Sequence, residues 1–183
     1  MLIYTGIGSR ETPSEVLNAM KDIGNQLAAS GWILRSGGAD GADSAFEAGV
    51  TNWAWDNQQG APTEIYLPWE GFNGRYSTRK GYFVASNDST YADAMDIAKR
   101  FHPNWGACSP GAKAMHARNV SQILGQDLNT PTNLVICWTK EGKGGGGTGQ
   151  ALRIAKHYNV PIIDLGKDPI SEVERITYEM ENP

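Results

Sequence analysis

The sequence predicts an α/β fold: a three-layer sandwich with a mainly parallel sheet and helices on both faces. Three observations predict it. Short apolar runs alternate with longer segments that carry apolar residues at helical spacing. Several of these runs end in glycine-rich loops that lead directly into the next helical segment, which makes the order Rossmann-like. The length of 183 residues suits one domain with its own core, so we expect a single domain over residues 1–183.

The first half of the chain repeats a strand–loop–helix unit. Residues 2–5 form an apolar run, and residues 13–29 have helical spacing after a start signal in which Thr12 is the expected N-cap and Pro13 the first helical residue. Residues 32–36 are the second expected strand, with a helix following through Gly49. Residues 64–67 are the third expected strand. Repetition of this unit favours parallel strands.

An excursion over about residues 68–110 follows in the middle of the chain. Its first part, to residue 82, is rich in glycine, aromatic residues and arginine and has no clear period, whereas residues 91–101 have helical spacing. Regular patterns then return as a helix over 111–124, a strand over 133–138, a helix over 150–158, a strand over 161–165 and a final helix from about Ser171. The excursion therefore interrupts an otherwise alternating chain.

Composition excludes several classes of protein. The net charge of -4 and the shortage of Lys/Arg clusters argue against DNA binding. Two cysteines give no disulfide framework, which favours a reducing, cytoplasmic location. The sequence has neither a signal peptide pattern nor an uninterrupted apolar run of about 18 residues, so we expect no membrane association.

The first glycine-rich loop is Gly6-Ile7-Gly8-Ser9-Arg10-Glu11. Ligands of open α/β sheets bind where the strands end and helices begin. Glutamate stands where the dinucleotide motif has its third glycine, which argues against NAD. A tight strand–helix turn is the structural alternative. We predict that Gly6, Gly8, Ser9 and Arg10 contact a ligand, because a hydroxyl and a guanidinium suit phosphate.

The second loop, Ser36-Gly37-Gly38-Ala39-Asp40-Gly41-Ala42-Asp43, is rich in acids. Asp40 and Asp43 both have a structural explanation at a helix N-terminus, with Asp40 as a cap. Glu47 lies one turn beyond Asp43 on the same face, where no capping rule requires it. We predict that Gly37, Gly38 and Asp43 bind the ligand. An acid here can bind ribose hydroxyls or stabilise a sugar cation.

The third loop, Lys143-Gly144-Gly145-Gly146-Gly147-Thr148-Gly149-Gln150, can wrap a phosphate with consecutive backbone N–H groups. Thr148 can cap the following helix while its hydroxyl meets the ligand. The Gly-Lys-Ser/Thr ending of a P-loop is absent, which argues against ATP hydrolysis. The predicted ligand-binding residues of this loop are Gly144, Gly145, Gly146, Gly147 and Thr148.

Together with Met115-His116-Ala117-Arg118-Asn119, these loops resemble the SLOG superfamily of Rossmann-like nucleotide-binding proteins, which includes the LOG phosphoribohydrolases, the DprA proteins and nucleotide-signal sensors. LOG enzymes have a Met-x-x-Arg segment and a Pro-Gly-Gly-x-Gly-Thr-x-x-Glu loop. Arg118 matches that arginine and residues 144–148 match the glycine–threonine core. Ala151 stands where the catalytic glutamate belongs, and Lys143 replaces the proline. The resemblance implies that Arg118 holds a nucleotide phosphate.

Two functions remain open at this point. The first is an enzyme that hydrolyses the N-glycosidic bond of a small nucleotide with Glu47, Asp40 and Arg118 as its catalytic residues. The second is a non-catalytic module that senses or sequesters a nucleotide signal. We predict no cofactor, and no metal, because the three histidines share no ligand spacing with one another or with the cysteines. Aromatic residues in the middle of the chain, together with the resemblance, predict a homo-oligomer.

Overall fold

The computed structural model describes the whole chain, Met1–Pro183, which folds around a six-stranded, all-parallel sheet. The strands are β1 (Ile3–Gly6), β2 (Ile33–Ser36), β3 (Thr63–Leu67), β4 (Tyr82–Val84), β5 (Leu134–Cys137) and β6 (Ile162–Asp164). Their order is β4-β3-β2-β1-β5-β6. The chain thus builds outward from β1 in one direction and then, from β5, in the other. The loops that follow β1 and β5 consequently diverge at a switch point, where open α/β sheets bind ligands.

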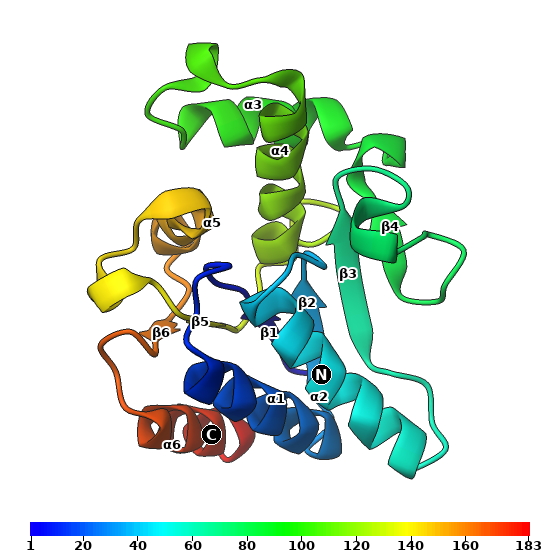
Figure 1. Cartoon of the computed structure of the whole chain (residues 1–183), viewed down its shortest axis with the longest axis vertical. Coiled ribbons are helices and arrows are strands. Elements are labelled where there is room, and N and C mark those ends of the chain that lie inside the picture. Colours follow the sequence, from blue (N-terminus) through cyan, green and yellow to red (C-terminus); the bar gives the residue numbers. More distant parts are fainter.

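The six helices divide into two sets of three, which pack on opposite faces of the sheet. The helices α1 (Ser14–Ala29), α2 (Ala42–Asp56) and α6 (Ile170–Glu181) share one apolar core with the strands. Figure 1 shows α1, α2 and α6 together on one side. The helices α3 (Tyr91–Arg100), α4 (Pro110–Leu124) and α5 (Gly146–His157) form the second core on the opposite face. This arrangement confirms the predicted three-layer α/β sandwich, with the sheet parallel throughout.

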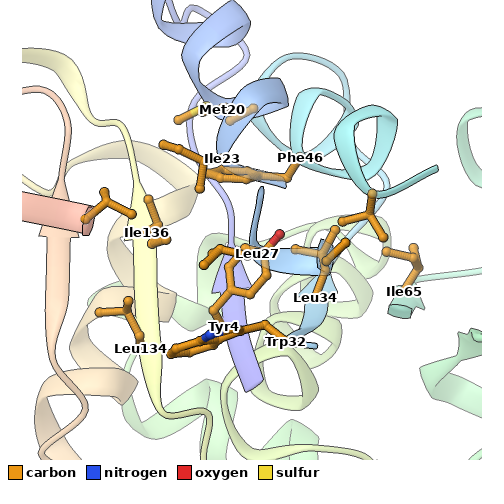
Figure 2. Packing of buried hydrophobic residues seen from close by; sticks show 14 of the residues in the cluster. Tyr4, Met20, Ile23, Leu27, Trp32, Leu34, Phe46, Ile65, Leu134 and Ile136 are labelled. Carbon is orange, nitrogen blue, oxygen red and sulfur yellow. The ribbon is translucent and has the colours of Figure 1, made fainter. Parts of the chain in front are cut away.

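Aromatic residues fill the centre of the first core, which Figure 2 shows between β1, β2 and the helices. The Tyr4 ring meets Trp32 and Phe46 edge-on, with ring centroids 6.2 and 6.0 Å apart. Such edge-to-face pairs are favoured by the charge distribution of the rings. All four residues of β5 are buried, as expected for a parallel strand that has helices on both sides. The core therefore holds the carboxyl ends of β1 and β5 in fixed positions.

The structure corrects several expected helix boundaries. Helix α1 begins at Ser14, and the Thr12 hydroxyl donates to the Ser9 carbonyl instead of capping the helix. Gly41, not Asp40, occupies the N-cap position of α2. Helix α5 begins at Gly146, so Thr148 lies in its first turn and does not cap it. None of the helices combines the length and apolar character needed to cross a bilayer.

Candidate functional site

A pocket of about 1000 Å³ lies at the carboxyl end of the sheet. Residues 7–11, after β1, and residues 139–148, after β5, supply two of its walls. Side chains of α4, from Ala112 to Gln122, supply a third, and the second loop adds Ala39 and Asp43. The pocket therefore lies at the switch point of the sheet, and all three glycine-rich loops reach it.

The third loop presents free backbone N–H groups to this pocket. Gly145, Gly146, Gly147 and Thr148 line it. The first N–H groups of a helix have no partner within the helix, and the helix dipole adds positive potential at that end. A Cβ atom added at Gly145, Gly146 or Gly147 would meet nothing within 4 Å, so the space over this helix start is open. The N-terminus of α5 is thus an accessible anion-binding end.

A chain of hydrogen bonds holds this loop in place. Thr139, two residues beyond the end of β5, donates its backbone N–H to Asp164 Oδ1 over 2.9 Å, and its hydroxyl donates to Asp164 Oδ2. The same hydroxyl accepts the N–H of Gly144 at 2.9 Å. Asp164 is buried at the end of β6. Sequence reasoning missed both side chains, although polar residues at the carboxyl ends of neighbouring strands are a usable signal.

Arg118 is buried in the wall of the pocket, with 4% of its surface exposed. Its Nη1 donates to the Gly37 carbonyl, and its Nε donates to Asn119 Oδ1 at 3.0 Å. The guanidinium also lies over the ring of Phe72, 5.4 Å from the centroid. Burial lowers the Arg118 pKa to about 10, so the group stays charged at neutral pH. Nη2 makes no hydrogen bond to the protein and remains available to a ligand.

Asp43 is the buried carboxylate of the pocket. Its Oδ2 accepts the N–H groups of Gly37 at 3.1 Å and Ala39 at 3.4 Å. Burial raises the Asp43 pKa from 3.8 to about 6, although the nearby Arg118 charge and the two N–H donors act in the opposite direction. The carboxylate therefore shapes the second loop and faces the pocket at the same time.

The first loop contributes Gly8, Ser9 and Arg10 to the pocket lining. The Ser9 hydroxyl oxygen accepts the N–H of Glu11 at 3.0 Å, which fixes the turn. Arg10 is exposed and forms no ion pair, so its guanidinium is free. Gly6 lies beneath the pocket, where a Cβ would come within 2.6 Å of the Phe46 ring.

The two acids proposed for catalysis lie outside the pocket lining. Glu47 is buried, and its carboxylate accepts from Arg75 Nε at 2.8 Å and from the Tyr82 hydroxyl. Asp40 is exposed and accepts from Asn73 Nδ2 at 2.8 Å. Both partners of Glu47, and the partner of Asp40, come from residues 73–82, in the predicted excursion. Gly37, Gly38 and Gly144 are also absent from the pocket lining.

Further pocket residues were not predicted. Asn119 and Gln122 on α4 add amide groups, and His116 adds an imidazole. Lys140 and Lys143 add positive charge after β5, although Lys143 forms an ion pair with Glu141. The position that a glutamate occupies in LOG enzymes holds Ala151, whose buried methyl group forms part of the pocket wall.

No protein-family model matches the chain, and neither does any curated protein. Among solved structures, the molybdenum cofactor carrier protein of Chlamydomonas reinhardtii is similar over 98% of this chain and 85% of its own, with a TM-score of 0.51 and 17% identity. DNA processing protein A of Helicobacter pylori is similar over 100% of this chain and 74% of its own, with a TM-score of 0.54 and 17% identity. These similarities show the Rossmann-like fold.

Proposed function

We propose that this protein binds a small phosphorylated ligand, a nucleotide or a nucleotide-derived molecule, and releases it unchanged. The observation that carries the proposal is the open N-terminus of α5, which shares one pocket with the free Nη2 of Arg118. Backbone N–H groups and a guanidinium are the donors that recognise phosphate best. Membership of the SLOG superfamily, which the loops of this chain resemble, is part of the same proposal.

The remaining lining suits the rest of a nucleotide. The pocket volume of about 1000 Å³ lies at the upper end of the range for small-molecule sites. Asp43, Asn119 and Gln122 offer acceptors and donors for ribose hydroxyls or for the edge of a base. Arg10 and Lys140 add exposed cations at the mouth, where they attract an anionic ligand.

The positions of the acidic side chains favour binding without turnover. Ala151 offers no carboxylate at the position where LOG enzymes have their glutamate. Hydrolysis by Glu47 would require it to leave Arg75 and Tyr82, and Asp40 would have to turn inward from the surface. The named properties of the structural neighbours, carriage of a cofactor and binding of single-stranded DNA, are binding functions as well.

Calorimetry with ribonucleoside 5′-monophosphates and the matching nucleosides tests this proposal. We expect a monophosphate to bind at least tenfold more tightly than its nucleoside, and chromatography after long incubation to recover it intact. Equal affinity for the two would contradict phosphate recognition. Release of free base would support the hydrolase instead, and tighter binding of an oligothymidylate than of any mononucleotide would support a DNA-binding module.

A further inference from the structure

Three side chains with metal-binding chemistry meet beside the pocket. His102, Cys108 and His116 each place a ligand atom within 4.8 Å of the other two, and all three are half-buried. His102 and Cys108 belong to the connection between α3 and α4, whereas His116 lies on α4. The short 3₁₀ turn Trp105–Ala107 brings the first two residues back toward the helix. Imidazole and thiolate are the ligands that Zn²⁺ prefers.

The separation of the ligand atoms fits one tetrahedral ion. Cys108 Sγ lies 3.6 Å from His102 Nε2. A Zn–S bond of about 2.3 Å and a Zn–N bond of about 2.05 Å at the tetrahedral angle place sulfur and nitrogen about 3.6 Å apart. The rings of His102 and His116 lie close to each other, with centroids 4.5 Å apart. The three groups therefore have the spacing of ligands around a common centre.

The neighbours of His116 hold its ring in the form that binds metal. Gln150 Oε1 lies 3.1 Å from His116 Nδ1, and Gln150 Nε2 donates to the Ala98 carbonyl at 3.1 Å. Because the second bond fixes the amide, the oxygen faces the imidazole and Nδ1 carries the proton. Nε2 is then left with a free lone pair. Metal-binding histidines usually have such a partner on the other ring nitrogen.

Without an ion, the ligand atoms of the cluster have only weak hydrogen-bond partners. The Asn104 N–H donates to His102 Nδ1 at 3.1 Å, and the Cys108 thiol is 3.6 Å from the Asn104 carbonyl. Burial lowers the pKa of His116, which favours the neutral ring. Metal binding through His102 Nε2 requires the ring proton to lie on Nδ1, so the ring must give up the Asn104 N–H, and Cys108 binds as the thiolate. Metal binding at such a site releases protons, because the thiol must be deprotonated.

We propose that His102, Cys108 and His116 bind one Zn²⁺ ion and leave its fourth position open to water or to a ligand atom. Three protein ligands with one free position are typical of zinc sites that interact with small molecules. His116 also lines the pocket, so the ion sits at the rim of that pocket. The assignment rests on the cluster alone and is independent of the ligand proposed above.

Titration of untagged, chelator-treated protein with Zn²⁺ in competition with a chromophoric chelator tests the site. We expect one equivalent to bind, and Co²⁺ to give the thiolate-to-metal charge-transfer band and intense visible bands of a tetrahedral ion. Cys108→Ser abolishes the charge-transfer band, and His116→Gln weakens Zn²⁺ binding by more than about a hundredfold, because even outer-shell changes weaken it 10- to 100-fold. His157→Gln, the matched control, retains full binding.

Circular dichroism tests whether each variant is folded. Where a variant does not fold, His102→Gln is measured in its place. Failure of the folded wild type to bind stoichiometric Zn²⁺ at micromolar concentration overturns the proposal. Equal loss of binding in His157→Gln overturns it as well, as does a cobalt charge-transfer band that survives in Cys108→Ser. None of these measurements requires the pocket ligand.

Discussion

The second and third glycine-rich loops look alike in sequence but differ in what surrounds their glycines. After β2, a Cβ at Gly37 would collide with Gln122 Nε2 and Arg118 Nη1, so this glycine makes room for side chains of α4. After β5, a Cβ at Gly145 or Gly147 would meet nothing within 4 Å. The first arrangement serves packing, and the second leaves room for a ligand.

The polar groups of the two loops differ in the same way. In the second loop, Asp43 accepts the N–H groups of Gly37 and Ala39, so acid and backbone satisfy each other. In the third loop, the N–H groups at the start of α5 have no partner within the helix. A glycine cluster in a sequence therefore indicates a special backbone, and the surroundings decide whether it packs or binds.

Removal of Arg118 should have the largest effect, because this buried residue both holds the second loop and lines the pocket. Arg118→Ala leaves the Gly37 carbonyl without its donor and the buried Asp43 without a neighbouring positive charge. We expect the free energy of unfolding in urea to fall by about 3 kcal/mol, and nucleotide binding to weaken roughly ten- to a hundredfold. Arg10→Ala, at an exposed position, should change stability by less than about 0.5 kcal/mol. Equal stability of the two variants would contradict this assignment.

The pH dependence of stability tests the raised pKa of Asp43. Its pKa is about 6 in the folded state against 3.8 normally, so between these values the folded protein binds more protons than the unfolded chain. Stability contributed by this group therefore falls as pH rises from about 4 to 6, by at most about 3 kcal/mol. Asp43→Asn should remove this fall in urea unfolding measured from pH 4 to 7. An unchanged pH profile in the variant would show that Asp43 titrates normally.

Gly37→Ala tests whether the second loop is tightly packed around its glycine. The added methyl group would push against Arg118 and Gln122 in a buried region, and such overpacking lowers stability by about 1–3 kcal/mol. We expect a corresponding drop in the midpoint of urea unfolding. A variant as stable as the wild type would mean that the second loop has spare room, and the contrast between the loops would disappear.

Most of the fold could be predicted from sequence because its strands and helices have clear periods. The exception is β4 (Tyr82–Val84), a three-residue edge strand at the end of an aperiodic, aromatic segment, where three residues carry no detectable period. The start of α5 was placed too late, because glycine is a poor helix former and yet Gly146 and Gly147 form its first turn.

The location of the pocket could be predicted because glycine-rich loops after parallel strands mark it. The hydrogen-bond partners of individual acidic side chains could not be predicted from the sequence. Glu47 is bound by Arg75, which lies 28 positions away in a segment with no regular pattern. The His102, Cys108 and His116 cluster depends on how one loop folds back onto α4, so the sequence gives no recognisable ligand spacing.

Gly147→Ala tests most directly whether the third loop is open because it binds a ligand. The new methyl group meets no protein atom within 4 Å, and Ala favours a helix, so thermal stability should be equal or slightly higher. The methyl group would occupy space that a phosphate needs next to the free N–H groups. Calorimetry should therefore show at least tenfold weaker binding of a ribonucleoside monophosphate than in Gly60→Ala, a control at another glycine with open surroundings. Affinities within twofold of each other in the two variants would contradict the account.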